Sequence, residues 1–224
     1  FVGRMVPYKG PDMLLEAADD GSEAHHALDQ IQRASERANA TTNHLLAFSR
    51  QRAFEPRETD LNAILQDLHH PVTKMIGERI RVRIEASPRL PAVMVDQGGL
   101  QQAVLNLIIN ARDALPSGGD IVLRTSRLRG RVGDRPTDEV VLAVIDNGTG
   151  IDPDLIDRVC EPFFTTKQAG EGTGLGLSMV SGFVEQCGGR CEITSDLGQG
   201  TTVSLILPVA TADATPDADP DTGQ

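Results

Sequence analysis

Residues 170–180 read GEGTGLGLSMV, so four glycines run directly into an apolar, helix-forming segment. Successive free backbone N–H groups and the positive N-terminus of a helix together form a cradle for phosphate groups. A Rossmann site needs its glycines directly after a β-strand, but the preceding residues CEPFFTTKQA do not have a strand pattern. The Gly-Lys-Ser/Thr ending of a P-loop is absent as well. The stretch therefore predicts a phosphate cradle of neither type. The candidate contacts are Gly172, Thr173, Gly174, Leu175 and Gly176.

A long helix is predicted upstream of this stretch, with Asp96 as its cap. Its buried face repeats at steps of three or four residues, at Leu100, Val104, Leu107, Ile108, Ala111 and Leu115. Asn106 and Asn110 lie outside this apolar stripe and share one face of the helix, four residues apart. An amide oxygen suits Mg²⁺, which keeps waters and phosphate oxygens as its other ligands. Two solvated or capping asparagines are the alternative interpretation.

The stretch IDNGTGI, residues 145–151, takes an acidic residue out of a hydrophobic strand directly into a loop with two glycines. Asp146 can accept a hydrogen bond from the exocyclic amine of a base, and Gly148 and Gly150 allow the backbone to approach a ligand ring. An ordinary turn has the same pattern and is the alternative.

Two further segments contain candidate ligand contacts. Phe163 and Phe164 precede Lys167 in a polar stretch typical of a mobile lid, in which the lysine is available to a phosphate; core packing is the alternative for Phe163. Residues 198–205, GQGTTVSL, place Thr201 and Thr202 after two glycines, where their hydroxyls can reach a base or a phosphate. A plain hairpin turn is the alternative here.

The hydrophobic periodicity predicts an α+β fold. Helices are expected at residues 24–51, 61–76 and 175–187, in addition to the helix that begins at Asp96. Alternating or apolar runs predict strands at 79–87, 121–125, 140–145, 190–194 and 202–207. One layer of helices on one layer of mostly antiparallel strands is the simplest architecture for this order.

The composition limits the possible partners. With 21 Lys and Arg against 32 Asp and Glu, the net charge of −11 disfavours nucleic acid and anionic membranes as partners. No apolar run reaches the roughly 18 residues of a membrane helix, so we expect a cytoplasmic location without membrane contact. Four of the acids lie in residues 209–224, which we expect to form a disordered acidic tail or linker. Three cysteines, Cys160, Cys187 and Cys191, are expected to be buried thiols.

Five segments, taken in order, resemble the N, G1, F, G2 and G3 boxes of the ATP-binding domain of sensor histidine kinases. They are QQAVLNLIINARDAL, DNGTGI, EPFFTTK, GTGLGLSMV and GQGTTV. The resemblance implies a two-layer α/β sandwich of the Bergerat type over residues 56–208, with ATP and Mg²⁺ as cofactors. It also implies that Asn110 binds Mg²⁺, that Asn106 supports the phosphates and that Asp146 recognises adenine. The glycines at 172, 174 and 176 would hold the phosphates at the lid.

The segment ANATTNHLLAFSRQ, within residues 24–55, resembles the second helix of the dimerisation and phosphotransfer hairpin of these kinases, particularly of hybrid kinases. This implies a homodimer and a response-regulator receiver domain as partners. In the family, a phosphoacceptor histidine followed by an acidic residue lies on the first hairpin helix. None of the five histidines here is followed by Asp or Glu, so the acceptor is missing from this sequence.

Residues 1–23 are atypical of such a kinase. The first 18, FVGRMVPYKGPDMLLEAA, resemble instead a strand-turn-helix segment of retaining glycosyltransferases. The sequence leads to one favoured hypothesis and two others. The favoured one is an ATP·Mg²⁺-dependent histidine kinase domain that does not label itself. The others are a non-catalytic ATP-binding dimerisation module and a glycosyltransferase fragment.

Overall fold

The computed structural model describes residues 54–132, 135–167 and 172–210. Residues 54–165 and 174–210 belong to one compact unit, which contains all the helices and strands of the described chain. The predicted helix at 24–51, the segment 1–23 and most of the predicted tail lie outside the described residues. No helix in the described ranges has the length and apolar character needed to cross a bilayer.

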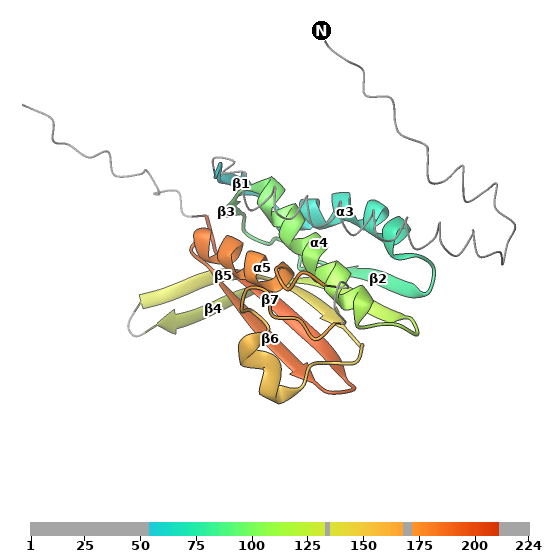
Figure 1. The fold of residues 1–224 in the computed structure, drawn as a ribbon. Helices are drawn as coiled ribbons and strands as arrows, with labels where there is room; N and C mark the ends of the chain where they lie inside the picture. The colour runs from blue at the N-terminus through green and yellow to red at the C-terminus, as the bar shows by residue number, and fades with distance from the viewer. Residues whose placement is uncertain (1–53, 133–134, 168–171, 211–224) are drawn as a thin grey trace, which may run out of the picture. The chain divides into compact units, whose positions relative to one another are not determined.

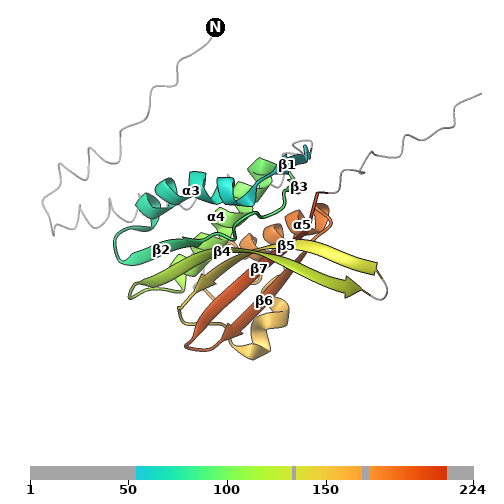
Figure 2. The same ribbon diagram turned by 180° about the vertical axis from the view of Figure 1, so that it is seen from behind.

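A five-stranded sheet forms one layer of this unit, in the order β2-β4-β5-β7-β6. The parallel pair is β2 with β4, and the other neighbours are antiparallel. The strands are β2 (Ile80–Glu85), β4 (Gly119–Val132), β5 (Arg135–Asp146), β6 (Arg190–Asp196) and β7 (Gly200–Pro208). The helices α3 (Leu61–Ile76), α4 (Gln97–Asp113) and α5 (Gly176–Gln186) cover one face of the sheet (Figure 1, Figure 2). The predicted two-layer α/β sandwich is confirmed.

The core lies between the helices and the sheet face beneath them. In β2, alternation turns Ile80 and Val82 into the core and leaves Arg81 and Arg83 exposed. In α4, residues spaced by three or four, such as Leu100, Val104 and Ile108, are fully buried. Asp96 caps α4 as predicted, because its carboxylate accepts a hydrogen bond of 2.7 Å from the Gly99 amide.

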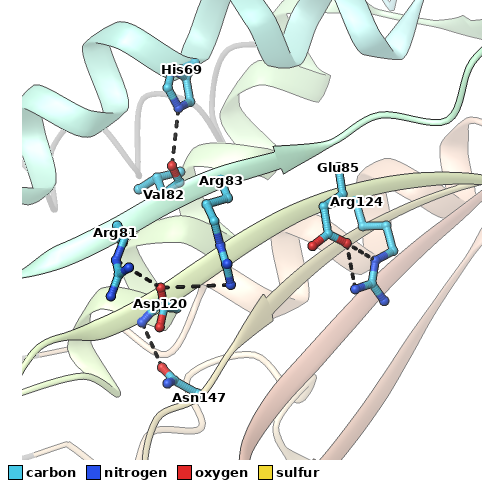
Figure 3. Close-up of polar contacts among 8 residues, drawn as sticks. All are labelled: His69, Arg81, Val82, Arg83, Glu85, Asp120, Arg124 and Asn147. Atoms are coloured by element: carbon cyan, nitrogen blue, oxygen red, sulfur yellow. Dashed lines mark hydrogen bonds and ion pairs between the residues drawn. The ribbon is translucent and has the colours of Figure 1, made fainter.

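The other face of the sheet carries charged pairs across β2 and β4 (Figure 3). Arg81 Nε lies 3.4 Å from Asp120 Oδ1, and Arg124 Nη2 lies 2.7 Å from Glu85 Oε2. Arg81, Arg124 and Glu85 are largely exposed and Asp120 is partly buried, so water screens the pairs and they add little stability. The face of the sheet that carries these charged pairs is therefore a polar surface opposite the helix layer.

At the outer edge of β2, the His69 ring of α3 lies 3.3 Å from the carbonyl oxygen of Val82.

A second, short sheet pairs β1 (Arg57–Thr59) with β3 (Val93–Val95). Val209 forms a bridge with Val93, and the Ala210 amide donates a 2.9 Å hydrogen bond to the carbonyl of Ala92. The first strand and the last described residues of this unit therefore both lie beside β3, whose next residue caps α4. The sequence did not predict β1, β3 or the 3₁₀ helix η1 (Pro153–Arg158).

Strands β4 and β5 are longer than the predicted segments 121–125 and 140–145. Their pairing continues through Leu128 opposite Glu139 and Arg129 opposite Asp138, where most side chains are exposed. Backbone hydrogen bonds sustain this part of the ladder without a buried face, so apolar periodicity does not reveal it.

Candidate functional site

Asp146 is the last residue of β5 and is 8% exposed on the helix-facing side of the sheet. Its Oδ1 accepts hydrogen bonds from the amides of Gly148 at 2.9 Å and Thr201 at 3.3 Å. Burial raises the pKa of the Asp146 carboxyl above its usual value, while these two hydrogen bonds partly counteract that rise. No donor among the described residues reaches the second oxygen, Oδ2. The backbone therefore holds the carboxylate through Oδ1 and leaves Oδ2 as a hydrogen-bond acceptor for a ligand.

The loop after Asp146 is pressed between α4 and the β6–β7 turn. A side chain at Gly148 would place its Cβ 2.4 Å from the carbonyl oxygen of Ala114, to which the Thr149 amide donates. Gly150 has φ +69°, and its Cβ would lie 2.1 Å from the carbonyl oxygen of Asp196. Contacts with the protein backbone explain why both positions are glycine. A ligand contact at these glycines stays a prediction.

Asn106 and Asn110 both lie on α4, but in different environments. Asn106 is 5% exposed, and its Oδ1 accepts a 3.1 Å hydrogen bond from Gln102 Nε2, one turn earlier. Asn110 is half-buried and faces the start of α5. A Cβ built on Gly176 would lie 3.5 Å from its Nδ2 and 4.0 Å from its Oδ1. The amide of Asn110 is thus the one directed at the helix that follows the glycine stretch.

The N-terminus of α5 differs from those of the other two helices. Asp60 caps α3 and Asp96 caps α4, whereas no side chain among the described residues caps α5 after Leu175. The first-turn amides of a helix lack intrahelical partners and carry partial positive charge. Beside Asn110, this end of α5 suits an oxygen-rich anion.

Phe163 and Gly174 contact each other through their backbones. The Phe163 amide donates a 2.9 Å hydrogen bond to the Gly174 carbonyl, and a Cβ at Gly174 would lie 2.3 Å from the Phe163 carbonyl carbon. Phe163 has φ +69° and is 74% exposed, whereas the Phe164 ring stacks under the guanidinium of Arg158 at 4.5 Å. Gly174 is therefore required by backbone contact.

Lys167, Gly172 and Thr173 lie in the segment 166–173, which belongs to a separate compact unit of the chain. Their contacts with a ligand stay predictions. Leu175 is the N-cap residue of α5 and Gly176 its first residue, and their contacts with a ligand stay predictions as well.

Thr201 contributes to the site through its backbone. Its amide donates to Asp146, while its hydroxyl lies 2.9 Å from Ser195 Oγ. Ser195 Oγ also donates to the Gly200 carbonyl at 2.9 Å and accepts from the Ile151 amide at 2.8 Å. The buried Ser195 was not predicted, although a polar residue at an inward position of β6 is a signal that could have revealed it.

No group of three or more His, Cys, Asp or Glu side chains gathers within the ranges 54–132, 135–167 and 172–210 in a way that could hold a metal ion. Cys160 and Cys191 are half-buried, Cys187 is buried, and all three are free thiols. Burial, chiefly, raises the pKa of Cys187 to about 11 and that of Cys191 to about 12. These thiols are therefore protonated at neutral pH and poor metal ligands.

Comparison with known proteins places this site in a family. The profile described as "Histidine kinase-, DNA gyrase B-, and HSP90-like ATPase" matches residues 95–211. The chain is 39% identical to the sensor kinase CckA of Brucella abortus over 88% of its own length and 22% of that protein. It is 34% identical to the sensor histidine kinase ZraS of Escherichia coli, covering 87% of this chain and 40% of the relative.

A solved structure, full-length ShkA in complex with AMPPNP, superimposes with a TM-score of 0.65 at 27% identity and covers 89% of this chain and 42% of that one. The chain thus spans less than half of each of these relatives. The matched residues contain α4, β5, α5 and all the candidate contacts described above. The chain belongs to the family of histidine kinase-, DNA gyrase B- and HSP90-like ATPases.

Proposed function

We propose that this chain binds ATP with Mg²⁺ where β5, α4 and α5 meet, as the catalytic domain of a sensor histidine kinase that transfers the γ-phosphoryl group to a histidine. The observation that carries the proposal is Asp146, buried and held through Oδ1 by two backbone amides. Its Oδ2 is the acceptor for the exocyclic amine of adenine. A buried carboxylate without a cation beside it is costly, so a ligand donor at this point is favourable.

The phosphates would lie at the N-terminus of α5. Its uncapped amides supply donors along the direction of the helix dipole, and Lys167 with Gly172, Thr173 and Gly174 is proposed to complete the cradle. Transfer of a phosphoryl group depends on positioning and charge neutralisation, so few reactive side chains are needed.

Asn110 is the proposed Mg²⁺ ligand. The Oδ1 of Asn106 is engaged by Gln102, whereas the Asn110 amide faces the α5 terminus. A single amide fits magnesium, because this ion takes its remaining ligands from water and phosphate oxygens. When bound, Mg²⁺ supplies positive charge to the triphosphate oxygens. Asn106, buried and hydrogen-bonded, is proposed to support the phosphates by keeping this face of α4 in place.

The remaining parts of the proposal concern the domain organisation, the partners and the location of the protein. Residues 24–55 are proposed to form a partial dimerisation helix of a homodimer, and a response-regulator receiver domain is the proposed downstream partner. The domain boundaries 1–23, 24–55, 56–208 and 209–224 belong to this proposal, as does a cytoplasmic location.

A non-catalytic ATP-binding module is the second candidate, because no histidine in the sequence is followed by an acidic residue. The discriminating experiment supplies a separate acceptor hairpin, taken from a related kinase, together with radiolabelled ATP. Label on the supplied histidine supports the kinase. ATP binding without transfer to any of several hairpins supports the non-catalytic module.

An Asn110→Ala variant tests the metal assignment in a nucleotide-binding titration with and without Mg²⁺. We expect it to lose Mg²⁺-dependent nucleotide binding, with Gln66→Ala on the exposed side of α3 as a matched control that keeps it. Unchanged Mg²⁺ dependence in Asn110→Ala would remove the assignment.

A further inference from the structure

We infer that Phe183, through its contact with Gly99 of α4, sets the distance between Asn110 and the N-terminus of α5. The inference rests on the proposed function and makes Phe183 and Gly99 positioning residues of the metal and phosphate site. Neither residue lies at that site: Phe183 is near the opposite end of α5, and Gly99 is in the first turn of α4.

α4 and α5 pack side by side in opposite directions over the sheet (Figure 1). Gly99, at the start of α4, meets Phe183 near the end of α5. Asn110, near the end of α4, faces the start of α5, where a Cβ built on Gly176 would lie 3.5 Å from its Nδ2. The residues Gly99 and Asn110 are about 16 Å apart along α4, at 1.5 Å per residue. One close approach at Gly99 and one wider approach at Gly176 therefore describe how α5 lies on α4.

The first approach leaves no room for a side chain at Gly99. A Cβ there would lie 2.5 Å from Cε2 and 2.8 Å from Cδ2 of the Phe183 ring. The ring thus rests directly on the backbone of α4. Val180 and Val184, both 0% exposed, keep the adjoining side of α5 in the core. The Phe183 ring acts as a spacer between the two helices.

A second contact supports this end of α5. Burial and, to a smaller extent, the nearby Asp96 carboxylate raise the pKa of the Cys187 thiol to about 11. Cys187 follows α5 directly, and Asp96 is the cap of α4. Cys187, buried at the end of α5, therefore lies close to Asp96 at the start of α4.

The opposite end of α5 is less closely packed on α4. Its N-terminus has no side-chain cap among the described residues, and even a Cβ built on Gly176 would reach Asn110 only at ordinary van der Waals distance. α5 is a short, stiff element of 11 residues, so a displacement at Phe183 moves its N-terminus as well. Misplacement of a binding group by about 1 Å can cost a factor of about 100 in rate, so shifts of a few tenths of an ångström matter here.

The test measures AMPPNP affinity of the complete 224-residue chain in Mg²⁺ and in EDTA, and takes the ratio as the magnesium gain. In Gly99→Ala the new methyl group displaces the ring, and we expect the gain to fall about tenfold, roughly 1.4 kcal/mol. In the double variant Gly99→Ala/Phe183→Leu the space is restored, and we expect a gain within about threefold of the wild type.

Two further variants guard against a failure to fold. Phe183→Leu alone loosens the spacer without inserting atoms, and we expect the gain to fall about threefold. Gly182→Ala is the matched control, because its Cβ meets nothing within 4 Å, and we expect an unchanged gain. Thermal unfolding of each variant shows that it is folded at the assay temperature.

A purely structural role predicts lower melting temperatures with an unchanged gain. An unchanged gain in folded Gly99→Ala and Phe183→Leu would overturn the inference, as would a double variant as weak as Gly99→Ala. A wild-type chain without any magnesium gain would instead overturn the proposed function on which the inference rests.

Discussion

Replacement of Asp146 by Asn is expected to change the base preference of the site and to stabilise the empty protein. The amide oxygen of Asn can keep the hydrogen bonds from Gly148 and Thr201 that Oδ1 accepts at 2.9 and 3.3 Å. The NH₂ group then occupies the position of Oδ2. The site would present a donor to the ligand where the wild type presents an acceptor.

The magnitude follows from the hydrogen bond that is lost. A hydrogen bond to a charged group contributes about 1.5–3 kcal/mol, so ATP affinity should fall about 10- to 150-fold. ITP differs from ATP in having a carbonyl in place of the exocyclic amine, so it should gain from the new donor. The wild type should prefer ATP, and Asp146→Asn should abolish or invert that preference.

The stability effect has the opposite sign. Burial raises the pKa of Asp146 above the ordinary 3.8, so the folded chain binds this proton more tightly than the unfolded chain. The free energy of unfolding therefore decreases as pH rises from 3.8 through the raised pKa. Above the raised pKa, the loss of stability caused by the ionised Asp146 is complete. Asn has no such titration. Asp146→Asn should melt at a higher temperature than the wild type at pH 7.5, with a smaller difference near pH 4.

Calorimetric titrations with ATP and ITP, and melting curves at the two pH values, test this pair of effects. Asp60→Asn is the matched control, because Asp60 caps α3 through a hydrogen bond to the Asn62 amide and Asn is an equally good cap. Equal ATP and ITP affinities in the wild type would refute the assignment of Asp146 as the amine acceptor.

Four other outcomes are expected. Gly150→Ala should unfold the chain or lower its free energy of unfolding by about 4 kcal/mol or more, because the new Cβ would lie 2.1 Å from the Asp196 carbonyl oxygen at φ +69°. A urea titration measures this loss, and Gly98→Ala, whose Cβ would lie 3.4 Å from Asp96 Oδ1, should be neutral or stabilising in it. Asp96→Ala should cost about 1 kcal/mol in that titration through loss of the α4 cap; no change would show the cap to be unimportant. The chain incubated with radiolabelled ATP should acquire no phosphohistidine, and stable labelling would contradict the missing acceptor.

The fold was largely predictable because its buried faces are periodic. Apolar residues alternate in residues 79–87 and recur every three or four residues after Asp96. The structure has β2 and α4 at these places, and both pack onto one core. The elements that escaped prediction lack this signal. β1 and β3 have three residues each, and the distal part of β4 has charged, exposed side chains.

The candidate site was predictable by residue but not by role. Asp146 and Asn110 were singled out from their position at the end of a strand and on a polar helix face. The use of the Thr201 backbone amide, rather than its hydroxyl, depends on pairing with Asp146 across 55 residues of sequence. Likewise, the reason for Gly148 is the Ala114 carbonyl, and the reason for Gly99 is the Phe183 ring. These contacts join separate elements, which local sequence patterns do not encode.

The most direct test of the central claim is a calorimetric titration of the complete chain with AMPPNP, in Mg²⁺ and in EDTA. The site formed by Asp146, Asn110 and the α5 N-terminus predicts saturable binding with one nucleotide per chain, tighter in Mg²⁺ than in EDTA. Absence of saturable binding under both conditions by a folded chain would contradict the account.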